Sequence, residues 1–144
     1  MNRVEKIILI ILAVEHLGFG LYGLYTPNSI AELTGYVLNS EFATSEIRAF
    51  YALISALGFM ALFAIFIGSI VRQTYILYAF IFGSILTGRL INFSITGESS
   101  TAINVAMVAE AIVIALCIWR LIALKNTTAA VSYTHLTLPT KRIV

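Results

Sequence analysis

The feature that most constrains this chain is a set of four apolar segments, each long enough to cross a bilayer as a helix. They lie at about residues 7–25, 47–71, 75–95 and 102–124. At ~1.5 Å per residue, roughly 20 helical residues cover the ~30 Å hydrocarbon core. Charged residues make up only 11% of the 144 residues, whereas soluble domains carry about 25%. The sequence predicts an all-α bundle of four transmembrane helices within residues 1–130.

A signal peptide is the alternative interpretation of the first segment, because Arg3 and Lys6 precede its apolar run. No small-x-small cleavage site follows, and apolar residues continue to Tyr25, which favours a membrane helix. Pro27 is expected to end this helix. The one long connection follows, with a short interfacial turn predicted at 30–36. Arg72-Gln73 is expected to form the next turn, and residues 96–100 the last one.

Residues 131–144 differ from the rest of the chain. They are polar, rich in threonine and interrupted by Pro139. This stretch resembles translated sequencing-adapter or vector read-through, and a genuine disordered tail is the alternative. It is predicted to lie outside the folded domain.

The basic residues predict the orientation of the bundle. Arg3 and Lys6 precede the first segment, Arg72 lies between the second and third, and Arg120 and Lys125 close the fourth. The other two connections contain no lysine or arginine. Because cytoplasmic loops carry an excess of these residues, both termini are predicted to be cytoplasmic.

Four charged residues from the four segments are predicted to lie at a similar depth. Glu15 is near the middle of the first segment, and Arg48 opens the second. Arg89 and Glu110 lie about 9 Å and 12 Å from the outer ends of their segments, from the helical rise. An unpaired Glu or Arg near a helix centre costs roughly 2.5–3.5 kcal/mol on insertion scales. These side chains are therefore expected to turn inward and pair, or the glutamates to be neutral.

A polar cluster in the outer half of the bundle is the predicted candidate site. Helical spacing groups its members with small residues on inward stripes. The candidate residues are Glu15, His16, Glu46, Arg48, Tyr51, Arg89, Asn92 and Glu110. One interpretation is a pocket open to the outer face, since ionisable groups inside membranes are usually functional. The other is an ion-pair network that only fixes the helix register.

Two motif-like features give no cofactor or metal assignment. Residues 18–23 match G-x-G-x-x-G, but they lie inside an apolar helix rather than between a strand and a helix, so packing glycines are favoured. His16 has no second histidine or cysteine at ligand spacing, so no metal is predicted.

The single cysteine, Cys117, excludes an intrachain disulfide. The net charge of +2 is too small to indicate nucleic acid.

Several residues together resemble a family of small bacterial four-span proteins, the domain of unknown function 4345. The resemblance covers about residues 1–125. It rests on Lys6 and its apolar run, the glycines at 18–23, Pro27, Glu46-x-Arg48-Ala49-Phe50-Tyr51, Gly88-Arg89 and Glu110. It implies the architecture and a location in the bacterial inner membrane, but no chemistry. A more general likeness to DoxX-like four-helix proteins, some of them linked to quinone or redox partners, transfers no residues.

Three function classes follow from the sequence. The first is binding or carriage of a lipid, a quinone or a small anion by the cluster, with both arginines holding an anionic or carbonyl group. The second is a structural or assembly subunit whose ion pairs serve folding only. Such a subunit would have a membrane-protein partner or form homo-oligomers. The third is a redox or proton-handling enzyme subunit. Whether the protein is an enzyme, and which cofactor it would use, does not follow from the residues.

Overall fold

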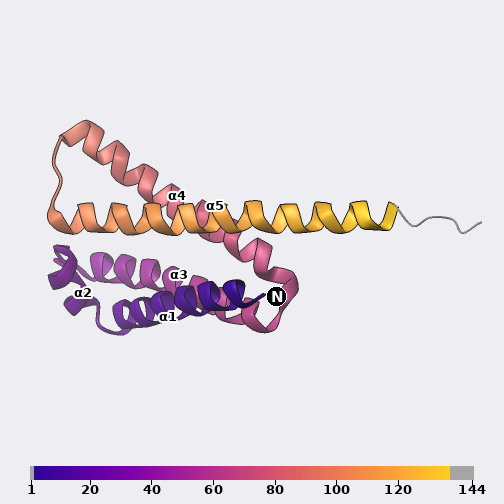
Figure 1. Cartoon of the computed structure of the whole chain (residues 1–144). Coiled ribbons are helices and arrows are strands. Elements are labelled where there is room, and N and C mark those ends of the chain that lie inside the picture. The colour runs from indigo at the N-terminus through magenta and orange to yellow at the C-terminus, as the bar shows by residue number, and fades with distance from the viewer. Residues whose placement is uncertain (1, 137–144) are drawn as a thin grey trace, which may run out of the picture.

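The computed structural model describes residues 2–136, with side chains described up to Lys125. This part of the chain is helical, as Figure 1 shows. The helices are α1 (Arg3–Tyr25), α2 (Pro27–Thr34), α3 (Glu41–Phe66), the 3-10 turn η1 (Gly68–Ile70), α4 (Val71–Thr96) and α5 (Thr101–Leu136). Among the described residues, four helices are long and apolar enough to cross a membrane.

Local sequence signals explain where the helices begin and end. The side chain of Asn2 accepts a hydrogen bond from the Glu5 amide at the start of α1, and Ser40 accepts one from the Ala43 amide at the start of α3. Such N-caps satisfy amides that have no partner within the helix. Gly35 and Gly97 follow α2 and α4 with φ of 81° and 68°, a conformation that favours glycine.

The observed helix boundaries differ from the predicted ones in three places. Pro27 not only follows α1 but opens α2 in its first turn, where a missing amide is tolerated. The Ser40 cap starts α3 at Glu41, before the predicted residue 47. The chain then reverses at Ile67 and η1, so Arg72 lies within α4 rather than in a turn.

The predicted tail lies partly within a helix. α5 extends to Leu136 and so includes the first residues of the stretch predicted to lie outside the domain. The rest of that prediction concerns residues 137–144, which lie outside the described part of the chain.

The four long helices form two hairpins. α1 packs along α3, and α4 packs along α5 (Figure 1). Glycines allow the first pair to approach closely. A Cβ at Gly20 would lie 2.6 Å from the backbone nitrogen of Ser55, and one at Gly58 would lie 2.6 Å from that of Leu17. Small residues at such contacts are typical of helix packing in membranes.

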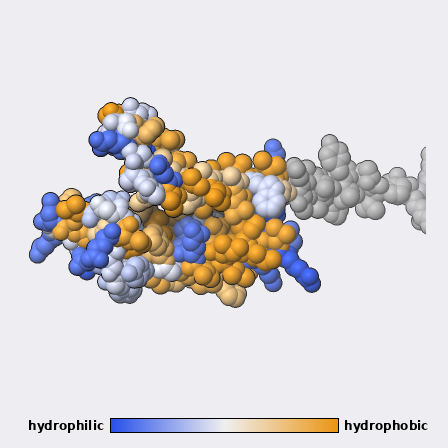
Figure 2. Space-filling view, turned by 60° about the vertical axis from the view of Figure 1, so that its left-hand side comes forward, coloured by the Kyte–Doolittle hydropathy of each residue, from blue (hydrophilic) through white to orange (hydrophobic). Residues whose placement is uncertain are grey.

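The two hairpins are joined mainly at one end. There the core includes Leu9 and Leu12 of α1, Tyr75 and Tyr78 of α4, and Cys117 of α5. The N-terminus, η1 and the outgoing end of α5 lie at this end, whereas α2 and the 97–100 connection lie at the other (Figure 1). The space-filling view shows an apolar band between hydrophilic ends (Figure 2).

Candidate functional site

The two hairpins enclose a cavity of about 1200 Å³ at the end where α2 lies. All four long helices contribute to its wall, and so do the connections after α2 and α4. At this end the molecular surface divides into two lobes (Figure 2). The cavity therefore reaches from the interior of the bundle to the end that the basic residues predict to be outside.

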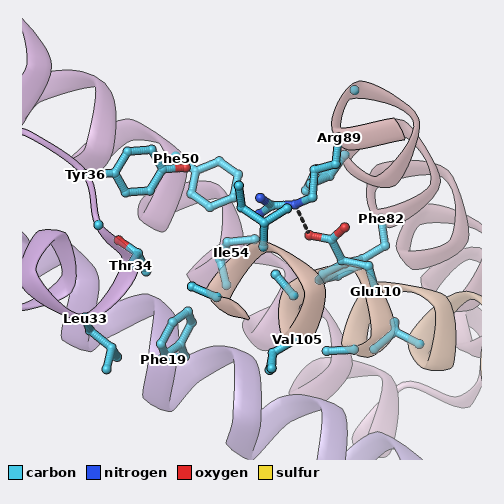
Figure 3. Close-up of a pocket in the computed structure, with 18 of the residues that line it drawn as sticks. Phe19, Leu33, Thr34, Tyr36, Phe50, Ile54, Phe82, Arg89, Val105 and Glu110 are labelled. Atoms are coloured by element: carbon cyan, nitrogen blue, oxygen red, sulfur yellow. Dashed lines mark hydrogen bonds and ion pairs between the residues drawn. The ribbon is translucent and has the colours of Figure 1, made fainter. Parts of the chain in front are cut away.

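An ion pair between α4 and α5 forms one wall of the cavity. Arg89 donates a hydrogen bond from Nε to Oε1 of Glu110 at 2.8 Å (Figure 3). The other carboxylate oxygen, Oε2, is buried and has no hydrogen-bond partner among the described residues. The two terminal nitrogens of Arg89 likewise form no hydrogen bond with any described residue. The pair thus leaves both an acceptor and donors unused, although Glu110 is only 6% exposed.

Aromatic side chains from the other hairpin form the facing wall. Tyr51 is buried, and its ring meets Phe19 at 5.4 Å and Phe50 at 5.3 Å between ring centres, both edge to face. Figure 3 shows Phe19 and Tyr36 on the side away from Glu110, with Phe50 between Tyr36 and Arg89. The Tyr51 ring also lies where a side chain at Gly23 would stand, which places it tightly against α1. These three residues, Phe19, Phe50 and Tyr51, form an aromatic wall that lines the same cavity as the charged pair.

His16 lies where the cavity meets the core. Its Nδ1 is 2.8 Å from the carbonyl oxygen of Leu12, and because a carbonyl only accepts, Nδ1 carries the proton. Its ring contacts Tyr78 at 4.9 Å and Phe82 at 5.1 Å, edge to face. These contacts fix the ring beside the cavity.

The structure brings most of the predicted site residues to this cavity. Those that line it are Glu15, His16, Tyr51, Arg89, Asn92 and Glu110. Arg48 and Glu46 are exposed and lie outside the lining. Of the four charges that were expected to meet, only Arg89 and Glu110 form an ion pair among the described residues, while Glu15 lines the same cavity and Arg48 lies outside it.

Helix geometry explains the position of Arg48. The buried face of α3 carries Ile47, Tyr51 and Ile54, spaced by four and three residues. Arg48 follows Ile47 by one residue and is rotated ~100° away from that face. Arg48 and Tyr51 are three residues apart, which one helical stripe allows, but the buried face contains Tyr51 and leaves Arg48 exposed.

Sequence analysis missed a second buried cluster at the opposite end of the bundle. Arg120 donates from Nε to Oε1 of Glu5 at 3.1 Å and also pairs with it through Nη2, while the Tyr75 hydroxyl donates to Oε2 at 2.6 Å. The sequence pattern placed Arg120 at the end of the fourth apolar segment and gave Glu5 no role. The available signal was spacing, because Glu5, Leu9, Leu12 and His16 share one helical face.

Comparison with known proteins gives one match. No curated protein and no solved structure matches the chain. A family described as a domain of unknown function matches residues 4–121, which include both clusters and all four long helices up to Leu121. The resemblance noted from the sequence is thereby confirmed, and the chain belongs to the family of the domain of unknown function DUF4345.

Proposed function

We propose that this protein binds a small amphipathic molecule of the membrane in the cavity between its hairpins. The observation that carries the proposal is the unused bonding capacity of the Arg89–Glu110 pair within a largely apolar cavity. A buried polar atom without a partner is costly and needs an explanation, such as strain, a functional role, or a water or ion that it binds. Ligand cavities typically combine apolar walls with a few placed polar groups.

The contrast with the other ion pair supports a binding role. Both carboxylate oxygens of Glu5 are hydrogen-bonded, one by Arg120 and the other by Tyr75. That cluster is buried in the core that joins the hairpins, as expected for a structural pair. Arg89 and Glu110 instead face a cavity and satisfy only part of their hydrogen-bonding capacity.

The proposed location is the bacterial inner membrane, with the cavity toward the outer leaflet. The support is the gathering of Arg3, Lys6, Arg72, Arg120 and Lys125 at the opposite end, together with the positive-inside rule. A ligand would then come from the outer leaflet or from the external medium.

The direct test is to identify molecules that co-purify with the protein in a mild detergent. A tryptophan at Ala106, which lines the cavity, is expected to fill it and remove the ligand. Val108 lies on the same helix, is 60% exposed and does not line the cavity, so Val108→Trp is the matched control. Mass spectrometry of extracts from the three proteins is the measurement. Equal ligand content in wild type and Ala106→Trp would contradict the proposal.

A structural role is the second candidate, because Arg89–Glu110 also ties α4 to α5. The double replacement Arg89→Leu with Glu110→Leu separates the two. A stabilised protein that keeps its co-purifying molecule would favour a purely structural pair, since replacing a buried ion pair by apolar residues often stabilises a protein. Loss of the molecule from a folded double variant favours binding.

A further inference from the structure

The charges that line the cavity differ from those that the sequence predicts. With Arg48 outside, the lining contains one arginine, Arg89, against three glutamates, Glu15, Glu98 and Glu110. One positive and three negative groups give a balance of −2 when all are ionised. Hydrocarbon around the bundle screens charge weakly, so this imbalance acts over the whole cavity.

Resting on the proposed function, we infer that the ligand of this cavity is an organic cation with an apolar body. A small anion, for which a pair of arginines was expected, would meet a net negative lining instead. The free oxygen of Glu110 is the specific attachment point. Its side chain is 8% exposed, lines the cavity, and has Oε2 without a partner among the described residues.

The aromatic wall supplies the second element of cation recognition. The faces of Phe and Tyr rings carry partial negative charge and attract cations, most strongly where water is excluded. Phe19, Phe50 and Tyr51 form contiguous edge-to-face contacts and line the same cavity as Glu110. Tyr36 and Phe82 add further aromatic lining (Figure 3).

Arg89 has a distinct role in this arrangement. Its hydrogen bond to Oε1 holds the Glu110 carboxylate and neutralises part of its charge. The remaining charge then comes from Glu15 and Glu98. Arg89 is thus a positioning residue that also limits the affinity for cations. Removing its charge is therefore expected to strengthen cation binding.

The probes for the test are tetraphenylphosphonium and tetraphenylborate, two ions of matched shape and opposite charge. Radiolabelled tetraphenylphosphonium is expected to bind the detergent-solubilised wild type saturably, and not Ala106→Trp. Tetraphenylborate is expected to bind at least about tenfold more weakly. The net negative charge of the lining repels this anion, and the surrounding hydrocarbon screens the repulsion only weakly. Val108→Trp is expected to behave as the wild type.

Charge variants then locate the effect. Glu110→Gln and Glu98→Gln are expected to weaken cation binding, and Arg89→Gln to strengthen it, each by about threefold to tenfold. Glu98 lies in the exposed 97–100 connection, so its variant tests the charge without disturbing the core. Arg48→Gln and Glu46→Gln are the matched controls, because both residues are exposed and outside the lining.

Preferred binding of tetraphenylborate, lost in Ala106→Trp, would overturn the cation inference while supporting the cavity as a binding site. Equal binding of tetraphenylphosphonium to wild type and Ala106→Trp would also overturn it. Weaker cation binding by Arg89→Gln, with the Arg48→Gln control unchanged, would contradict the proposed role of Arg89. The co-purification experiment separately decides the proposed function.

Discussion

Two glutamates of this chain occupy opposite situations although both are buried beside an arginine. Glu5 is 2% exposed and has both oxygens bonded, by Arg120 and Tyr75. Glu110 is 6% exposed and has one oxygen bonded, by Arg89. The completeness of the hydrogen bonding, and not the presence of an ion pair, separates the structural cluster from the candidate binding site.

At the residue scale, Glu5→Leu is expected to destabilise the protein by about 3–5 kcal/mol, because it leaves the Arg120 charge buried without a partner. The measurement is thermal unfolding in detergent. Lys6→Leu is the matched control, since Lys6 is the next residue and is exposed. Adding Arg120→Leu to Glu5→Leu is expected to recover much of the loss. An unchanged melting temperature for Glu5→Leu would show that the cluster does not hold the hairpins together.

At the scale of elements, the close contact of α1 with α3 depends on which glycines face the neighbouring helix. Gly20 and Gly23 would each place a Cβ against atoms of α3, whereas Gly18 would meet nothing within 4 Å. The G-x-G-x-x-G string therefore combines two packing glycines with one that faces outward. This position of the string within α1 agrees with packing rather than nucleotide binding.

Gly20→Ala is expected to destabilise the protein by about 1–3 kcal/mol, because its methyl group would overlap the backbone of Ser55 and push the helices apart. Gly18→Ala is the control, with an expected gain of roughly 0.5–1 kcal/mol from the higher helix propensity of alanine. Unfolding in detergent measures both. Similar stability of the two variants would be inconsistent with the close approach of α1 and α3.

At the scale of the whole molecule, the two hairpins are joined at one end and separated by the cavity at the other. The joined end contains the Glu5 cluster and the shared core. The other end contains α2, the 97–100 connection and the cavity lining. If basic residues face the cytoplasm, the cavity opens to the outside.

This orientation predicts the reactivity of single cysteines in intact cells. In a Cys117→Ser background, Ser99→Cys is expected to react with an impermeant maleimide, and Gln73→Cys is expected to react only after the cells are lysed. Ser99 lies in the connection at the cavity end, and Gln73 lies near η1 at the joined end. Labelling of Gln73→Cys but not Ser99→Cys in intact cells would reverse the orientation and place the cavity toward the cytoplasm.

The sequence by itself determined the elements of this protein and several members of its candidate site. Segment length and composition predicted four long apolar helices, because a bilayer requires about 20 apolar residues to cross it. The cost of lone charges in hydrocarbon indicated that Glu15, Arg89 and Glu110 turn toward a common region, and these residues line one cavity. The residues that open and close helices, such as Ser40 and Gly97, acted locally.

Only the tertiary structure decided which helices pair and which side chains meet. A charge at a helix end can lie in water or in the core, so Glu5 and Arg120 were not recognisable as partners from their positions in the chain. Arg48 has the spacing of an inward residue, yet the packing of α3 on α1 turned it outward. The negative charge balance of the cavity follows from the outward position of Arg48. Helix periodicity defines the possible faces of a helix, whereas contact between helices selects the face that is buried.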